Sequence, residues 1–166
     1  MKRVISILVS ISVCFSVFAV AKNSANPRIF DINQGRETVM SDVVQALKQN
    51  RIVIVGEHHG NPNHHAAQVR VIRALKESGV QVAVGLEMFR GDSQQALDRW
   101  VAGDIAEKDF QQIFYDNWGY SWEDYRVIFD YAKAEKVPLI GLNVARDITR
   151  QVSRRGFASL NEEQRG

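Results

Sequence analysis

The 166-residue sequence predicts an α/β fold in which a partial open parallel sheet is flanked by helices. Three observations lead to this prediction. Short apolar runs alternate with segments of helical periodicity, the runs are rich in aliphatic residues, and each run ends on polar side chains. Alternating strands and helices imply parallel strands joined by right-handed crossovers. The three predicted strands make only part of a normal open sheet, so either an edge is exposed or further chain covers it.

The first 21 residues have the three regions of a secretory signal peptide. Lys2 and Arg3 precede an apolar run from Val4 to Val20, and Ala19-Val20-Ala21 is a small-x-small cleavage pattern. The alternative is a membrane-spanning helix, which needs about 20 apolar residues; this run is slightly shorter and four serines interrupt it. We therefore expect a cleaved signal peptide, export to the periplasm or the outer membrane, and a mature domain over residues 22–166.

The only cysteine, Cys14, lies inside the signal segment, so the mature chain has no disulfide. A lipoprotein would carry its lipid on Cys14. That route is disfavoured because Val13 stands where a small residue is wanted and the apolar stretch continues past the cysteine.

The net charge of the mature chain argues against nucleic acid as a partner. The chain has 21 basic and 19 acidic residues, and loss of Lys2 and Arg3 leaves 19 of each. A neutral mature chain lacks the basic surface that binding to nucleic acid requires. No nucleic-acid partner is expected.

The first half of the mature chain predicts a helix, a strand and a second helix. A lead-in helix is expected over residues 41–49. Residues 52–56 form a continuous run rich in β-branched side chains, which is typical of a strand buried on both faces. The next helix begins at Pro62 or His64, carries an apolar stripe, and ends before Gly79.

The second half continues the alternation. The clearest helix covers residues 121–136, because Trp122, Tyr125 and Ile128 recur at helical spacing. Near the end, Asn161 has the properties of an N-cap with two glutamates behind it, but the helix body is missing, which indicates either a truncated chain or a frayed terminus. The other predicted elements are strands at 80–87 and 138–143 and helices at 93–103, 107–115 and 145–155.

All four histidines lie within eight residues, directly after the first predicted strand and Glu57. Imidazole is the common metal ligand and titrates near neutrality. If the strand continues, His58 and His59 point in opposite directions, and we favour His59 as the one that faces a pocket. A helix N-terminus keeps His64 and His65 neutral and competent as ligands, although a plain capping role fits equally well.

Polar residues also end the other two predicted strands, at Glu87 and Asn143. Open α/β sheets bind ligands at the carboxyl ends of their strands, where parallel geometry gathers these residues on one rim. Glu87 ends a buried strand, so its carboxylate needs a cation, a proton or hydrogen-bond donors. We expect His59 and Glu87 on the same rim, with His64 or His65 close by. Glu57 as a helix cap and Asn143 as a helix start are the structural alternatives.

The tyrosines are a second candidate set. The segment Asn117-Trp118-Gly119-Tyr120-Ser121-Trp122 offers flat apolar surface for a macrocycle, and tyrosinate is an axial ligand of ferric haem. Tyr125 lies on the apolar stripe of its helix and is typical of core, so Tyr120 is the preferred ligand. The mature chain has no Gly-x-Ser-x-Gly elbow, no phosphate loop, and no cysteine for thiol chemistry or a c-type haem.

Four blocks of this sequence resemble the ChaN-like haem-binding uptake family, within the Tiki and erythromycin-esterase-like superfamily. The resemblance covers most of the mature chain, and the blocks occur in family order. It implies export, a role in haem or iron acquisition, haem held between two subunits of a homodimer, an outer-membrane haem transport system as partner, and a longer protein. The blocks are Gly56-Glu57-His58-His59, His64-His65 with Gln68, Gly85-Leu86-Glu87-Met88-Phe89, and Pro138-Leu139-Ile140-Gly141-Leu142-Asn143.

Three functional hypotheses follow. The first is an exported haem-binding protein. The superfamily resemblance also implies a metal-dependent hydrolase, in which His59 and Glu87 would act with a divalent metal. The third is a truncated fragment without function. The candidate cofactor-binding residues are Glu57, His58, His59, His64, His65, Glu87, Tyr120 and Asn143, and the candidate metal ligands are His59 and Glu87.

Overall fold

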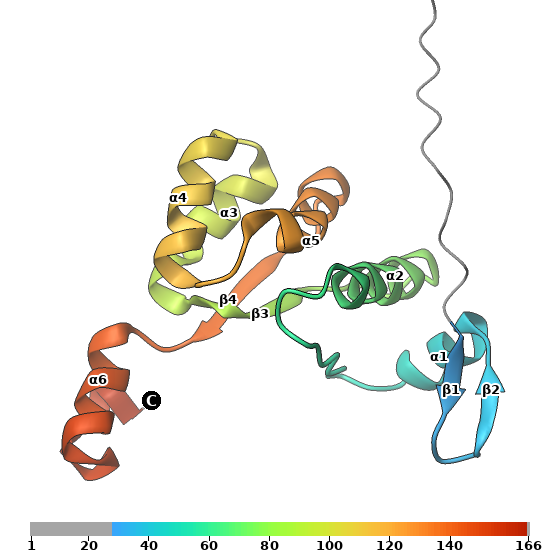
Figure 1. The fold of residues 1–166 in the computed structure, drawn as a ribbon, viewed down its shortest axis with the longest axis horizontal. Helices are drawn as coiled ribbons and strands as arrows, with labels where there is room; N and C mark the ends of the chain where they lie inside the picture. The colour runs from blue at the N-terminus through green and yellow to red at the C-terminus, as the bar shows by residue number, and fades with distance from the viewer. Residues whose placement is uncertain (1–27, 166) are drawn as a thin grey trace, which may run out of the picture.

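The computed structural model describes residues 28–165 (Figure 1). The predicted signal peptide and Cys14 lie outside these residues. Within them, no helix has the length and apolar character needed to cross a membrane. In chain order the elements are β1 (Ile29–Asp31), β2 (Arg36–Thr38), α1 (Met40–Leu47), α2 (Pro62–Glu77), β3 (Val84–Arg90), α3 (Gln94–Ala102), α4 (Glu107–Asn117), α5 (Trp122–Glu135), β4 (Leu139–Asn143), α6 (Arg146–Arg155) and α7 (Glu162–Arg165), with 3₁₀ turns at Gly91–Ser93 and Phe157–Ser159.

Strands β3 and β4 pair in parallel, which confirms the α/β class. Leu86 pairs with Gly141 and Arg90 pairs with Asn143, so four steps along β3 match two steps along β4. The extra backbone of β3 passes directly over Gly141, where a Cβ atom would lie 2.6 Å from the carbonyl oxygen of Arg90. A glycine is required there because no side chain fits under that carbonyl.

An aromatic core joins β3 to helices α3, α4 and α5, which lie together on one side of the two strands (Figure 1). Phe89 of β3 stacks on Phe110 of α4, with ring centroids 5.7 Å apart. The indole N–H of Trp100 donates to the carbonyl of Phe129 at 2.8 Å, so the buried polar atom is satisfied. The largest fully buried side chains are Trp100, Trp122, Tyr125, Phe89, Phe110, Phe114 and Phe129.

Within residues 28–165, one face of the sheet is left uncovered. Leu86 and Leu139 are buried in the core, whereas Ile140 and Leu142 of β4 are 44% and 63% exposed. This alternation follows from the two-residue period of a strand, which sends neighbouring side chains to opposite faces.

The prediction of a first buried strand at residues 52–56 is wrong. This segment forms no strand, and its Ile52 and Ile54 side chains are 79% and 90% exposed. A parallel strand is stable when neighbouring strands and helices bury it. Among the described residues no strand pairs with this segment, so its aliphatic composition alone does not produce a strand. The second predicted strand is shifted, since β3 begins at Val84 and continues to Arg90.

The helix predictions are confirmed, with ends that differ by a few residues. Asn161 accepts a hydrogen bond from the backbone N–H of Gln164 at 2.8 Å and so caps α7. The antiparallel β1–β2 hairpin was not predicted. Its strands have three residues each, which is too short for an alternating pattern to emerge.

Candidate functional site

The Glu57 carboxylate is the centre of a hydrogen-bonded cluster in the loop before α2. Its Oε1 atom lies 2.8 Å from His59 Nδ1 and accepts a 2.7 Å hydrogen bond from the Tyr125 hydroxyl. Its Oε2 atom accepts a 3.1 Å hydrogen bond from Gln68 Nε2 and lies 3.0 Å from His65 Nε2. These contacts connect the loop to α2 and α5. We call these five side chains the Glu57 cluster.

The contacts within the cluster shift two pKa values. Burial alone would raise the pKa of Glu57, but the hydrogen bonds from His59 and Tyr125, the charge of His65 and the Gln68 amide together hold it below its ordinary value. Burial first, and then the Glu57 acceptor, raise the pKa of Tyr125 to about 12. Near neutral pH, Glu57 is therefore ionised and Tyr125 is a protonated donor.

Two of the four histidines join this cluster. His65 is fully buried, and its Nδ1 donates to the backbone carbonyl of Asp124 at 2.6 Å, while its Nε2 lies 3.0 Å from Glu57 Oε2 without a hydrogen bond to it. His59 contacts Glu57 through Nδ1, which must carry the proton because a carboxylate accepts. The lone pair of neutral His59 is therefore on Nε2.

The other two histidines contact each other instead. The backbone N–H of His58 donates to His64 Nδ1 at 2.7 Å, and the two rings are 6.1 Å apart. The preference for His59 over His58 agrees with this geometry, since His59 faces the Glu57 carboxylate. The cap of α2 is Asn61, whose side chain accepts from Asn63 N at 3.0 Å.

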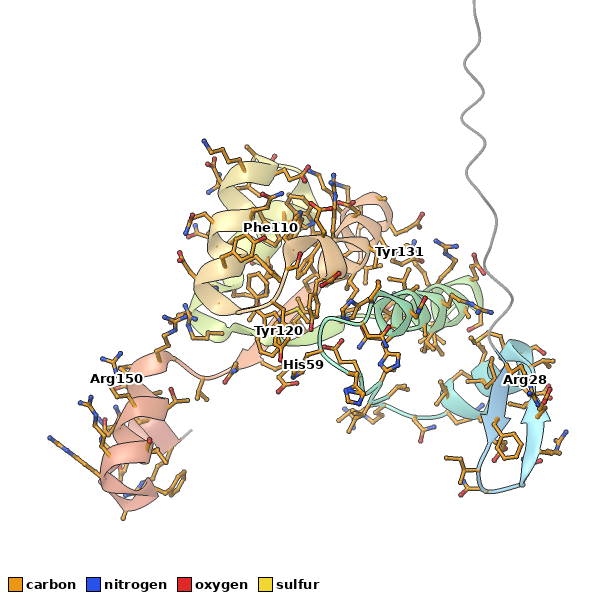
Figure 2. All side chains as sticks on the ribbon, in the orientation of Figure 1. Arg28, His59, Phe110, Tyr120, Tyr131 and Arg150 are labelled. Atoms are coloured by element: carbon orange, nitrogen blue, oxygen red, sulfur yellow. The ribbon has the colours of Figure 1, made fainter. Side chains whose placement is uncertain are left out.

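His59 of the Glu57 cluster also packs against two aromatic side chains, Trp118 and Tyr120. The His59 ring lies 5.0 Å from Trp118 and 5.1 Å from Tyr120, and Trp118 lies 5.5 Å from Tyr120. Figure 2 shows His59 and Tyr120 side by side, although they come from distant parts of the chain. Tyr120 is 42% exposed. We call His59, Trp118 and Tyr120 the aromatic wall.

A cavity of about 520 Å³ lies between the loop, α2 and β3, and His59 and Trp118 of the aromatic wall line it, whereas Tyr120 does not. His59, Glu57 and Glu87 all line this cavity, as do aliphatic side chains of α2 and β3. His59 and Glu87 therefore line one space, but not as residues at adjacent strand ends. Residues 52–56 form no strand, and Glu87 lies exposed in the middle of β3 rather than at the end of a buried strand. Asn143 does not line the cavity; its side-chain oxygen accepts from the backbone N–H of Val144 at 2.9 Å.

The structure gives no support for the divalent metal alternative. Among residues 28–165, no group of three or more His, Cys, Asp or Glu side chains is arranged to hold a metal ion.

Three residues of the site were not among the eight candidate cofactor-binding residues, namely Tyr125, Gln68 and Trp118, although Trp118 lies in the segment expected to offer flat surface to a macrocycle and Gln68 in a block of the family resemblance. Tyr125 was assigned to the core from its helical spacing, and it is indeed buried. A buried phenol needs a hydrogen-bond partner, and this requirement was the available signal for a second role. Its partner, Glu57, is 68 positions away, so the sequence could not identify it.

The fold and the site together define an α/β domain with an exposed aromatic wall beside a cavity. The family described as haem-binding uptake, Tiki superfamily, ChaN matches residues 43–166, and the chain belongs to this family. A solved structure, described as cofacial heme binding to ChaN of Campylobacter jejuni, has the same fold with a TM-score of 0.64 and 22% sequence identity. The match covers 76% of this chain and 52% of that one, so this chain spans about half the length of its structural relative. No match was found among curated proteins.

Proposed function

We propose that this protein binds haem at the aromatic wall and serves in haem or iron acquisition. The observation that carries the proposal is the wall itself, in which the rings of His59, Trp118 and Tyr120 lie 5.0 to 5.5 Å apart, with His59 and Trp118 also lining the cavity. A porphyrin is a flat, largely apolar ring, and aromatic side chains pack well against such surfaces. Membership of a haem-binding uptake family supports the same ligand.

Tyr120 is the proposed iron ligand. A tyrosine binds ferric haem as the tyrosinate. Tyr125 is unsuited to this role, because its hydroxyl donates to Glu57 and its pKa is raised to about 12. Tyr120 belongs to the wall and is partly exposed, so its hydroxyl is accessible to a ligand. The wall contains a second atom that can coordinate iron, the Nε2 of His59, which carries the lone pair of the neutral ring.

We extend the proposal to location and assembly. A signal peptide cleaved after Ala21 would send the protein to the periplasm or the outer membrane, where haem and an outer-membrane haem transport system would be its partners. One wall covers one face of a porphyrin. A second copy of the chain would cover the other face, which supports a homodimer with haem between its subunits. The relative from Campylobacter jejuni is described as binding haem cofacially.

The test is a titration with hemin followed by absorption spectroscopy. We expect a shifted Soret band for the parent protein and, for Tyr120→Phe, a different spectrum with affinity reduced by about tenfold or more, as for loss of a strong ligand. Tyr131→Phe is the matched control, because Tyr131 lies on α5 beneath Arg73 and away from the wall. A spectrum identical to that of free hemin throughout the titration would refute the proposal.

The hydrolase hypothesis has one observation in its favour. A carboxylate on Nδ1 leaves His59 Nε2 as a base, which is the arrangement of a general base in hydrolysis. The same preparation is therefore assayed for ester turnover and for metal content. Turnover that disappears in Glu57→Gln, without a Soret shift in the parent, would favour hydrolysis over haem binding.

A further inference from the structure

Two arginine side chains converge on one backbone carbonyl near the aromatic wall. Arg90, the last residue of β3, donates from Nη1 to the carbonyl oxygen of Asp116 at 3.0 Å. Arg146, the first residue of α6, donates from Nη2 to the same oxygen. Since each guanidinium is within hydrogen-bond reach of one atom, the two positive groups lie within about 6 Å of each other. We call them the arginine pair.

The arginine pair is attached to the segment that carries the wall. Asp116 and Asn117 end α4, and Trp118 of the wall follows directly. The backbone N–H of Arg90 also donates to the side chain of Asn117 at 3.1 Å. The pair and the wall are thus positioned by the same short stretch of chain.

The two arginines differ in their charged neighbours. Arg90 Nε lies 3.3 Å from the Asp92 carboxylate, and the Asp116 carboxylate accepts from Gln112 at 3.2 Å. Among residues 28–165, no carboxylate lies within 4.0 Å of the Arg146 guanidinium. The shared carbonyl carries no net charge, and the Arg90 side chain is 16% exposed. Arg90 is thus paired with Asp92, whereas the exposed Arg146 guanidinium has no such partner and is accessible to an added anion, which opposite charge would attract.

The start of α6 adds to the same preference. Ala145 precedes the helix and provides no side-chain cap, so the first backbone N–H groups of α6 have no side-chain acceptor. Arg146 also places a positive charge at the positive end of the helix dipole, which an anion would relieve, and Asp147 in the first turn offsets this in part.

We propose that the arginine pair binds carboxylate groups, namely the propionates of a haem that packs on the aromatic wall. The guanidinium fork matches a carboxylate through two parallel hydrogen bonds, and two guanidiniums suit a ligand that carries two carboxylates. Trp118 lies two residues beyond the carbonyl that the pair binds, so the ring and the acidic edge of one molecule would meet neighbouring parts of one segment. This inference rests on the proposed haem-binding function.

The experiment compares hemin with hemin dimethyl ester, in which both propionates are esterified. The protein is expressed from its full coding sequence, and both dissociation constants are measured for the parent, Arg146→Gln and Arg154→Gln. Arg154→Gln is the matched control, because it removes one positive charge from the same helix about 12 Å further along its axis. Arg146 is exposed, so its replacement leaves the core intact.

We expect the parent to bind hemin about tenfold more tightly than the ester, as for a charged hydrogen bond, and Arg146→Gln to lose this preference. Affinity for the ester should be the same in all three proteins, and Arg154→Gln should retain the preference. Equal affinity of the parent for hemin and ester, or an unchanged preference in Arg146→Gln, would overturn the role of the pair while leaving haem binding intact. Failure of the parent to bind either compound would instead remove the proposed function itself.

Arg90→Lys provides a second variant that keeps the positive charge. A lysine lacks the planar fork, so the preference for hemin should fall although the net charge is unchanged. The unfolding midpoint of this variant is measured in parallel, because Arg90 is mostly buried. A full preference for hemin in Arg90→Lys would contradict bidentate binding by this residue.

Discussion

Replacement of Tyr125 by phenylalanine removes the hydroxyl that donates a 2.7 Å hydrogen bond to the Glu57 carboxylate and leaves the buried ring in place. A hydrogen bond to a charged group contributes about 1.5–3 kcal/mol, and one between neutral groups about 0.5–1.5 kcal/mol. Because Glu57 is ionised near neutral pH, we expect Tyr125→Phe to lower the free energy of unfolding by about 1.5–3 kcal/mol there.

The pH dependence of the free energy of unfolding tests independently whether the Glu57 carboxylate is charged. The cluster holds the pKa of Glu57 below its ordinary value of 4.5, so this stabilisation is present above that value and is lost as the pH falls through the lowered pKa. Removal of one donor moves the pKa of Glu57 back toward its ordinary value. Tyr125→Phe should therefore lose less additional stability than the parent as the pH is lowered below 4.5.

Urea denaturation followed by circular dichroism measures both effects. The matched reference is a double-mutant cycle with Glu57→Gln, which removes the charge and retains a hydrogen-bond acceptor. In the Glu57→Gln background, Tyr125→Phe should cost about 0.5–1.5 kcal/mol. An equal cost in both backgrounds would refute the charged hydrogen bond, because the loss would then come from packing alone.

Two further predictions concern β3, β4 and the cavity. Gly141→Ala should destabilise the protein by about 1–3 kcal/mol in urea denaturation, because its Cβ atom would lie 2.6 Å from the Arg90 carbonyl oxygen. Gly119→Ala, with no atom within 4 Å of the added Cβ, should change stability by less than about 0.5 kcal/mol, and equal midpoints for the two variants would contradict the close approach. His59→Ala and Glu87→Ala should each weaken hemin binding by about fivefold, the cost of one hydrogen bond. The unfolding midpoint of Glu87→Ala should stay close to that of the parent because Glu87 is exposed at the cavity, whereas His59→Ala also removes a hydrogen bond to Glu57 and should lower the midpoint. Unchanged hemin affinity in both would exclude these residues from the site.

The helices could be predicted from the sequence because their hydrogen bonds are local and their apolar stripes recur every three or four residues. The spacing of Trp122, Tyr125 and Ile128 identified α5, and all three side chains are buried. Strands depend on partners elsewhere in the chain. The aliphatic run at residues 52–56 has the composition of a buried strand, but in the described residues it has no strand to pair with.

In the candidate site, too, contacts between residues close in sequence could be predicted and contacts between distant residues could not. Glu57 and His59 are two residues apart, so a local sequence pattern could predict their contact. The contact of Glu57 with Tyr125 spans 68 positions and that of Arg90 with the Asp116 carbonyl spans 26. These contacts depend on how α4 and α5 pack against the strands, which no local pattern encodes.

The open face of the sheet has a practical consequence for work in solution. In the described part of the chain, Ile140 and Leu142 present aliphatic surface to water on the side of β4 that the helices leave uncovered. The attraction between such surfaces weakens on cooling, since apolar hydration carries a large heat capacity. Self-association of the protein through this face should therefore decrease at low temperature and increase on warming, and spectroscopic titrations are best performed cold and dilute.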